Sequence, residues 1–363
     1  MNAAHPSSSA AGASVAPQVT PFLQVSGLSK RLGRAQALLD VELTAHADEL
    51  LVVLGPTGAG KTTLLRTLAG LEEPDTGSIR MAGREVTGLE PAQRDVALVF
   101  QNFSLYPRWT VRKNLEFPLR APGRNLDEAE VGRRVSWASE LLHITRYLDR
   151  EASRLSGGEM QRVAIGRAIV RRPRLFLMDE PLTNLDAKLR EALRVELVEL
   201  RRELKTPLIF VTHDQAEALS MGDRIVVLSE GRVLQTGTPR EVYERPCSPV
   251  VALQLGQPAI NLIPVRRVAG QWLTSDGMPL MSAADASGAA ERLLGIRPEN
   301  ITPTQDDGQY PAVVQLVEYI GPTTTLLVQW GTSRLHVVIP RRGAFRVGDR
   351  IRLHVNPDRA VFF

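Results

Sequence analysis

Cysteine is nearly absent from this chain of 363 residues, in which Cys247 is the only one. One cysteine cannot form an internal disulfide, and it argues against a zinc site built from cysteines. This usage is typical of a reducing compartment. Long apolar runs are missing too, since no stretch approaches the ~18 to 20 residues that a membrane-spanning helix needs. If the protein works at a membrane, we expect another chain to do the spanning.

Signals for export and for nucleic-acid binding are also lacking. Residues 1–19 have neither the basic start nor the apolar centre of a signal peptide, and their Ser- and Ala-rich composition predicts a disordered tail. The formal net charge of +4 comes from interspersed charges, without an RNP-like or zinc-finger pattern. We therefore expect a mixed, solvated surface and no nucleic-acid partner.

A glycine-rich stretch, residues 55–62 (GPTGAGKT), lies between an apolar run of strand length and a helical pattern. Its glycines let successive backbone N–H groups approach an anion, and the first N–H groups of the following helix have no internal partner. We expect Lys61 to reach the β- and γ-phosphates of a nucleotide and the Thr62 hydroxyl to ligate Mg²⁺. A turn that only joins two elements would need neither residue, so the stretch indicates a nucleoside triphosphate site.

Polar residues follow three other apolar runs. Asp179 and Glu180 end one run, Gln101 follows a second, and His213 follows a third. In α/β folds, ligand-facing groups lie at the carboxyl ends of such strands. Asp179 would hold Mg²⁺, and Glu180 would orient and deprotonate the water that attacks the γ-phosphate. Alone, the carboxylate pair could cap a helix and the histidine could be structural; beside a phosphate loop, His213 could instead contact the γ-phosphate.

A second glycine-rich stretch, residues 155–168 (LSGGEMQRVAIGRA), begins another predicted helix. Ser156, Gly157 and Gly158 form an anion-binding helix end that has no lysine or metal ligand of its own. Such an end can grip a phosphate that is already held by another subunit.

The order of the apolar patterns predicts an α/β fold followed by a smaller all-β region. Short runs over residues 22–55 predict a β-layer, and the pattern from about 103 to 170 is helical, with a helix capped by Asp127. A long amphipathic helix is expected over 187–204. Prolines and the loss of periodicity around 240–264 indicate a domain boundary.

Beyond that boundary, β-type runs separated by Gly and Pro predict a small antiparallel barrel. The runs cover residues 272–273, 293–296, 313–317, 325–330, 335–339 and 350–355. The segment 282–290 is expected to be a loop. We therefore divide the chain into a tail (1–19), a nucleotide-binding domain (20–245) and a C-terminal domain (246–363).

Six motifs, in this order along the chain, resemble those of the ATPase subunit of an ATP-binding-cassette (ABC) transporter. Residues 55–62 match Walker A, Gln101 the Q-loop, 155–159 the signature motif, 175–180 Walker B, 183–186 the D-loop and His213 the switch histidine. The resemblance implies a P-loop NTPase with a RecA-like core, an antiparallel β-layer and a helical insertion. It also implies ATP and Mg²⁺ as cofactors.

The same resemblance implies a site that is shared by two chains. Each ATP would lie between Lys61 of one subunit and Ser156–Gly158 of the other in a head-to-tail dimer with a second copy or a paralogous ATPase. The implied catalytic residues are Lys61, Glu180 and His213, and the implied metal ligands are Thr62, Gln101 and Asp179. The implied nucleotide-binding residues are Gly55, Pro56, Thr57, Gly58, Ala59, Gly60, Lys61, Thr62, Thr63, Gln101, Ser156, Gly157, Gly158, Glu159 and Asp186.

Several stretches, among them 100–107 (FQNFSLYP) and 295–300 (GIRPEN), resemble the maltose-importer type of ABC ATPase, whose C-terminal OB-like barrel is a regulatory TOBE domain. This implies two membrane-spanning permease subunits, an extracytoplasmic solute-binding protein that acts indirectly, and a place at the cytoplasmic face of the inner membrane. The implied cargo is a sugar or related polyol; importers of polyamines, sulfate or iron and a soluble non-transport ABC ATPase are the alternatives. The barrel could also be a binding module for a small molecule or an inhibitory partner.

Two residues depart from the family pattern. Leu32 stands where an aromatic residue usually stacks on adenine, so we expect relaxed discrimination between ATP and GTP. Glu159 replaces the commoner glutamine in the signature motif. A carboxylate is favourable at a helix N-terminus but adds negative charge near the nucleotide, so we expect at most a modest effect on the rate.

Overall fold

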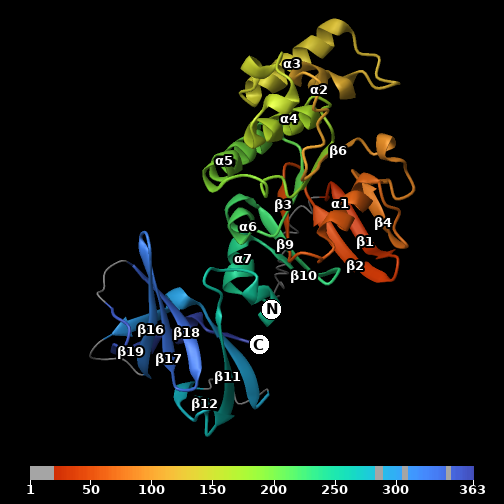
Figure 1. Ribbon diagram of the computed structural model, residues 1–363. Coiled ribbons are helices and arrows are strands. Elements are labelled where there is room, and N and C mark those ends of the chain that lie inside the picture. The colour runs from red at the N-terminus through yellow and green to blue at the C-terminus, as the bar shows by residue number, and fades with distance from the viewer. Residues whose placement is uncertain (1–19, 283–288, 305–309, 341–344) are drawn as a thin grey trace, which may run out of the picture.

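The computed structural model describes residues 20–282, 289–304, 310–340 and 345–363. An α/β part is joined to an all-β part, with the helical insertion at one end of the molecule and the all-β part at the other (Figure 1). The predicted tail 1–19 and most of the predicted loop 282–290 lie outside the described residues. Within the described ranges, no helix is both long enough and apolar enough to cross a membrane.

A six-stranded sheet forms the centre of the α/β part, in the order β10-β9-β3-β8-β7-β6. Its strands are β3 (Leu50–Leu54), β6 (Val96–Val99), β7 (Leu175–Asp179), β8 (Leu208–Thr212), β9 (Arg224–Ser229) and β10 (Arg232–Gly237). All neighbours are parallel except β9 and β10. Every residue of β3, β7 and β8 is buried, which explains their continuous apolar sequences. Their carboxyl ends meet at one edge of the sheet, where Gly55, Glu180 and His213 follow.

The sheet is covered on both faces, because successive residues of a strand point to opposite sides. Leu51 and Val53 of β3 share a core with α1 (Lys61–Ala69) and the β-layer, whereas Leu50 and Val52 share a core with the helices on the other face. Those helices include α4 (Gly157–Ile169), α5 (Ala187–Leu204) and α6 (Gln215–Met221). In α1, Leu64, Leu65 and Leu68 are fully buried, and each such side chain contributes about 1.5–3 kcal/mol to folding.

The predicted β-layer is present as an antiparallel sheet in the order β2-β1-β4-β5. Its strands are β1 (Leu23–Leu32), β2 (Ala35–Ala45), β4 (Thr76–Met81) and β5 (Arg84–Glu85). β1 and β2 are longer than the predicted runs. Bulges in β1 interrupt the alternation of buried and exposed residues that sequence patterns rely on.

The helical insertion is also present, with α2 (Val111–Glu116), α3 (Glu128–Leu141) and α4 as its α-helices. α3 begins where predicted, because the Asp127 carboxylate accepts a hydrogen bond of 2.6 Å from the Glu130 N–H. Val131, Val135 and Ala138 are buried along one face of the helix, as their spacing predicts. The long helix predicted over 187–204 has those limits as α5.

Two short helices, α7 (Pro239–Glu244) and α8 (Pro249–Leu253), occupy the stretch that we interpret as a boundary without regular structure. Pro239 and Pro249 each stand at the first helical position, after the caps Thr238 and Ser248. Proline is favoured there because its missing N–H would have no helical partner. These two prolines therefore start helices, which the sequence interpretation missed.

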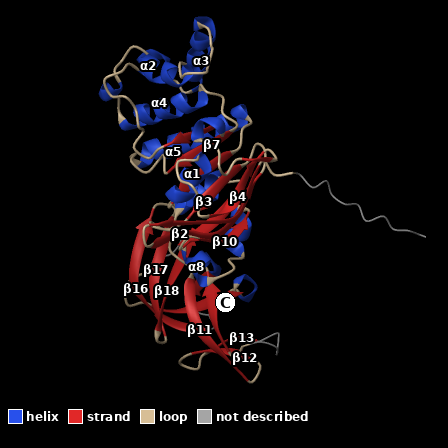
Figure 2. Ribbon diagram, turned by 90° about the vertical axis from the view of Figure 1, so that its right-hand side faces the viewer, coloured by secondary structure: helices blue, strands red, loops and turns tan. Residues whose placement is uncertain are grey.

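The all-β part contains two five-stranded antiparallel sheets, ordered β13-β12-β11-β14-β20 and β15-β19-β16-β17-β18. Figure 2 shows β16–β18 standing beside β11–β13. The strands are β11 (Asn261–Val268), β12 (Gln271–Thr274), β13 (Pro279–Ser282), β14 (Glu291–Ile296), β15 (Ile301–Thr304), β16 (Tyr310–Ile320), β17 (Thr323–Trp330), β18 (Ser333–Pro340), β19 (Arg350–Val355) and β20 (Val361–Phe362). Side chains from both sheets, including Trp272, Leu294, Leu326 and Leu353, form one core. All six predicted runs are strands, whereas β11, β13, β15 and β20 were not predicted.

Candidate functional site

The phosphate loop lies between β3 and α1, tightly packed against neighbouring backbone. Gly60, the N-cap of α1, has φ 102°, and a Cβ there would lie 2.2 Å from the Ala37 carbonyl oxygen. A Cβ on Gly55 would lie 2.3 Å from the Leu228 carbonyl oxygen. Glycine is therefore required at both positions, at Gly60 for its left-handed conformation as well as for space.

Lys61 is only 5% exposed, and its side chain curls over the loop. Its ammonium donates hydrogen bonds to the carbonyls of Gly55 (2.9 Å) and Pro56 (3.0 Å). It also lies 3.3 Å from Oε1 of Glu180. A buried ammonium needs such partners, and here they hold its charge at the mouth of the loop.

Asp179 and Thr62 meet beside the loop, because the Thr62 hydroxyl donates to Oδ1 of Asp179 over 3.1 Å. Asp179 is 7% exposed at the end of β7. Burial raises the pKa of this carboxyl, the hydrogen bond from Thr62 opposes the shift, and the neighbouring Glu180 adds to it. Two side-chain oxygens are thus brought together beside a buried carboxylate.

Glu180 connects the lysine to the histidine. Its Oε2 lies 2.9 Å from Nδ1 of His213 and accepts a hydrogen bond of 3.3 Å from the Thr183 hydroxyl. The carboxylate favours the tautomer of a neutral His213 that carries its proton on Nδ1. The backbone of Glu180 has φ 44°, in the left-handed region. A non-glycine residue with this angle carries backbone strain, and such strain is retained only where the surrounding structure enforces it.

The loop that carries His213 is held from behind by Glu217. The Thr212 hydroxyl donates to Oε2 of Glu217 over 2.5 Å and accepts a hydrogen bond of 2.9 Å from the Asp214 N–H. Glu217 is 4% exposed; burial raises its pKa, and the hydrogen bond from Thr212 partly offsets that rise. The sequence interpretation did not single out Glu217, and no local signal marks it.

These groups surround a cavity of about 600 Å³ at the carboxyl edge of the central sheet. It is lined by Leu32, Ala35, Gln36, Ala37, Thr57, Gly58, Gly60, Lys61, Thr62, Thr63, Gln101, Glu180, Thr183 and His213. Most of the predicted nucleotide-binding and catalytic residues of the phosphate loop and strand ends are therefore together. Ala35–Ala37, at the start of β2, and Thr183 were not predicted as individual site residues. Thr183 lies in the predicted D-loop, whereas Ala35–Ala37 carry no signal in the sequence.

The signature residues are separate from this cavity. Ser156 caps α4: its N–H donates to Oε2 of Glu159 over 2.8 Å, and its hydroxyl accepts from the Glu159 N–H over 3.4 Å. Burial opposes ionisation of Glu159, but hydrogen bonds from Tyr147 and Ser156 leave its pKa below the usual value. Asp186, also predicted at the site, instead caps α5 through the Leu189 N–H at 3.0 Å. Neither set lines the cavity within this chain.

Gln101 and the loop after β7 are joined directly. The Asn184 side-chain amide donates to the Gln101 carbonyl over 3.2 Å. Gln101 lines the cavity, and the chain continues from it into the helical insertion.

Comparisons with known proteins agree with this geometry. Residues 38–183 match the ABC transporter family, and residues 294–363 match the TOBE domain. The chain is 44% identical to the sn-glycerol-3-phosphate import ATP-binding protein UgpC 3 of Rhizobium johnstonii, over 87% of this chain and 89% of that protein. It is 41% identical to the sn-glycerol-3-phosphate import ATP-binding protein UgpC of Cupriavidus pinatubonensis, over 91% of this chain and 94% of that protein.

A solved ATP-binding cassette, in a dimeric post-hydrolysis state with ADP and Pi bound, is similar at 30% identity with a TM-score of 0.54. The match covers 60% of this chain and 99% of that one. The predicted P-loop fold, ATP binding and ATPase activity are thereby confirmed. The chain belongs to the ATP-binding subunits of ABC transporters, and it carries a TOBE domain at its C-terminal end.

Proposed function

We propose that this ATPase drives the import of sn-glycerol-3-phosphate or a closely related sugar or polyol. The relatives above are matched over nearly their whole length, and their names assign them to sn-glycerol-3-phosphate import. We expect the cargo not to touch this subunit, so the proposal rests on those relatives and on the maltose-importer-like motifs. We further propose that residues 20–245 form the nucleotide-binding domain and residues 246–363 the regulatory domain.

The observation that carries the proposed mechanism is the separation of two halves of a site. Lys61, Glu180 and His213 line one cavity, whereas Ser156–Gly158 begin α4 outside it. The free N–H groups of Gly157 and Gly158 suit an anion that is presented by a second copy. Each nucleotide would therefore be closed between the phosphate loop of one subunit and the signature helix of its partner.

The residues at the loop also fit Mg²⁺, which typically binds through one or two protein oxygens together with phosphate oxygens and water. Thr62 and Asp179 would hold it, with Gln101, which lines the same cavity, as a further ligand. The raised pKa of Asp179 supports this fit, because burial leaves its negative charge poorly compensated. When bound, Mg²⁺ supplies positive charge to the phosphates.

Glu180 is the proposed general base. Its Oε1 contacts Lys61 and its Oε2 contacts His213, so the carboxylate is held in a fixed position from which it would accept a proton from water. His213 would orient the carboxylate and contact the γ-phosphate. Lys61 would leave its carbonyl partners for the phosphates, whose negative charge attracts it more strongly.

An apolar groove supports docking to membrane-spanning permease subunits at the cytoplasmic face of the inner membrane. It has a volume of about 590 Å³ and lies between the α/β core and the helical insertion. Leu71 and Phe117, which line it, are 43% and 47% exposed, and Phe100, which also lines it, directly precedes Gln101 in the chain. Apolar surface of this kind marks interaction sites, and this one adjoins the Q-loop.

The test is reconstitution of the full transporter in lipid vesicles with its permease subunits and solute-binding protein. We expect sn-glycerol-3-phosphate to stimulate ATP hydrolysis and to accumulate inside, with maltose, putrescine and sulfate as alternative solutes. The Glu180→Gln variant is the matched control and should assemble without transporting. Stimulation by putrescine or sulfate alone would contradict the proposed cargo, and hydrolysis without any dependence on the permease would contradict the transport role.

A further inference from the structure

Arg297, in the all-β part, is buried against the two short helices α7 and α8, which precede that part in the chain. It follows β14 and is 5% exposed. Its Nη2 donates to the Tyr243 carbonyl over 2.9 Å, and its Nη1 donates to the carbonyls of Ala252 (3.2 Å) and Leu255. These carbonyls stand in the last turns of α7 and α8 or just beyond, where helices leave acceptors without internal partners. One guanidinium therefore caps both helices.

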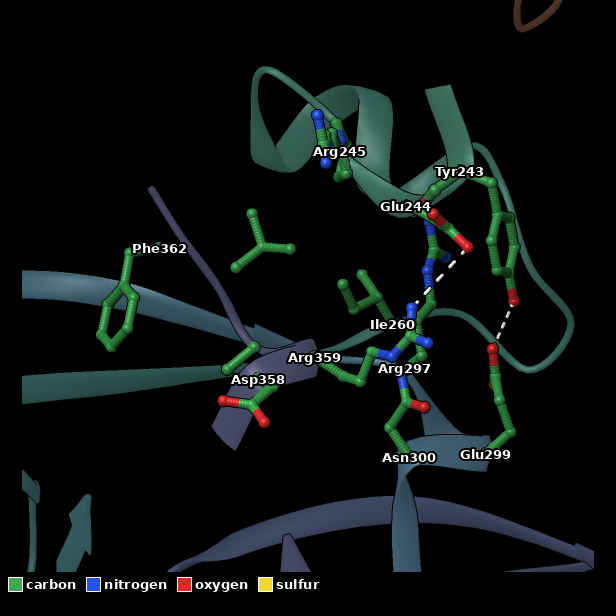
Figure 3. Close-up of a pocket in the computed structure, with 13 residues that line it drawn as sticks. Tyr243, Glu244, Arg245, Ile260, Arg297, Glu299, Asn300, Asp358, Arg359 and Phe362 are labelled. Carbon is green, nitrogen blue, oxygen red and sulfur yellow. Dashed lines mark hydrogen bonds and ion pairs between the residues drawn. The ribbon is translucent and has the colours of Figure 1, made fainter. Parts of the chain in front are cut away.

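A second set of contacts holds the guanidinium in place. It lies over the Tyr243 ring at 4.0 Å from the ring centre, and the Tyr243 hydroxyl donates to Oε1 of Glu299 over 2.7 Å. Figure 3 shows Tyr243, Arg297 and Glu299 on the wall of a cavity of about 660 Å³ between the two parts of the chain. Because the guanidinium is planar, stacked on a ring and carries its donors in fixed directions, these contacts set its orientation as well as its position.

The segment whose carbonyls accept hydrogen bonds from Arg297 also contacts the start of α6. Gly256, directly after Leu255, donates its N–H to Oε1 of Gln215. Gly256 has φ 99°, and a Cβ there would lie 2.7 Å from Nη1 of Arg297, so the segment follows the guanidinium closely. Gln215 is the first residue of α6, two positions after His213.

From these contacts we propose that Arg297 is a positioning residue for ATP hydrolysis. By capping the carbonyls around Leu255, it places the Gly256 N–H, which fixes Gln215 and the first turn of α6. That turn sets the position of His213 against Glu180. The all-β part thus acts on His213 and Glu180 through three groups in a row, which are the Arg297 guanidinium, the Gly256 N–H and the Gln215 side-chain oxygen.

Disruption of these contacts should lower kcat for ATP hydrolysis and leave ATP binding in place. Lys61 and Thr62 belong to another loop and do not contact this relay, so ATP binding should persist. Misplacement of His213 should lower kcat, because catalysis depends on geometry more sharply than binding does. Loss of one neutral hydrogen bond of the relay corresponds to about a threefold to tenfold decrease in kcat.

The experiment uses steady-state ATP hydrolysis by the full-length chain, with thermal unfolding as a check on folding. Gln215→Ala removes the acceptor, Gln215→Glu keeps it, and Arg297→Lys keeps the charge without the planar set of donors. Arg359→Ala is the matched control, because Arg359 joins the all-β part to α7 through Glu244 at 3.7 Å but does not contact α6. The inference rests on ATP hydrolysis and not on the identity of the solute, so a failed cargo assignment leaves it intact.

We expect Gln215→Ala and Arg297→Lys each to lower kcat by about threefold to tenfold with KM for ATP within about twofold. Gln215→Glu and Arg359→Ala should keep the wild-type kcat. The double variant Gln215→Ala/Arg297→Lys should be no slower than the slower single variant, because both act on one relay. A wild-type kcat in Gln215→Ala, or single losses that multiply in the double variant, would overturn the proposal, and the Gln215 variants decide it even if Arg297→Lys does not fold.

Discussion

The side chain at position 32 gives a direct test of how the nucleotide base is held. Leu32 ends β1, is 45% exposed and lines the nucleotide cavity beside Ala35–Ala37. An aromatic ring that stacks on a base contributes about 1–3 kcal/mol, which a leucine cannot supply. Because position 32 is half open to solvent, we expect Leu32→Tyr to gain the lower end of this range, or about fivefold to tenfold tighter ATP binding.

The assay is equilibrium titration of the full-length chain with ATP and with GTP. Wild-type affinities for the two nucleotides should lie within about threefold of each other, because no ring selects the base. Leu316→Tyr is the matched control, since Leu316 is 46% exposed but lies on β16 in the all-β part. This control should leave both affinities unchanged.

Two results would refute the reasoning about Leu32. One is a Leu32→Tyr variant with wild-type affinity for ATP, which would place the base away from β1. The other is a strong wild-type preference for ATP over GTP, which would show that groups other than a stacked ring select adenine.

Three further substitutions test the site. Glu180→Gln should bind ATP and form the closed dimer while hydrolysis falls by about 10²- to 10⁴-fold in a phosphate-release assay; full hydrolysis would disprove the assigned role. Glu159→Gln should change the hydrolysis rate by less than about tenfold, because an amide oxygen can still accept from the Ser156 N–H, and a larger loss in the same assay would contradict this. Burial raises the pKa of the Glu217 carboxyl, so the folded chain binds the carboxyl proton more tightly than the unfolded chain does. The free energy of unfolding should therefore fall as pH rises from the ordinary glutamate pKa of about 4.3 to the raised pKa of the folded chain. In a plot of melting temperature against pH, Glu217→Gln should reduce the slope over this pH range. An unchanged slope would mean that Glu217 does not titrate there.

Features encoded by neighbouring residues could be predicted from the sequence. The phosphate loop, the strands that end at Asp179 and Thr212, and the cap at Asp127 each depend on spacing within a few residues. The structure places them as expected because local preference and burial agree. The roles assigned to the individual site residues stay predictions.

Features that depend on distant residues could not be predicted. Strand β11 contains Pro264, which argues against a strand, yet its pairing with β12 begins only at Val265, so the missing N–H costs no ladder bond on that side. Arg297 and Tyr243 are separated by 54 positions in the chain, and neither carries a local signal for contact with the other. Glu217 is likewise recognisable only once Thr212 is seen to donate to it.

The left-handed backbone at Glu180 has a consequence for how this chain tolerates change. A non-glycine residue at φ 44° carries a conformational cost of about 1–2 kcal/mol that glycine would avoid. Glycine at position 180 would avoid that cost but would also remove the carboxylate that contacts Lys61, His213 and Thr183, and a buried charge that loses its partner costs more than this strain. The contacts of the carboxylate therefore offset the strain of the backbone that carries it.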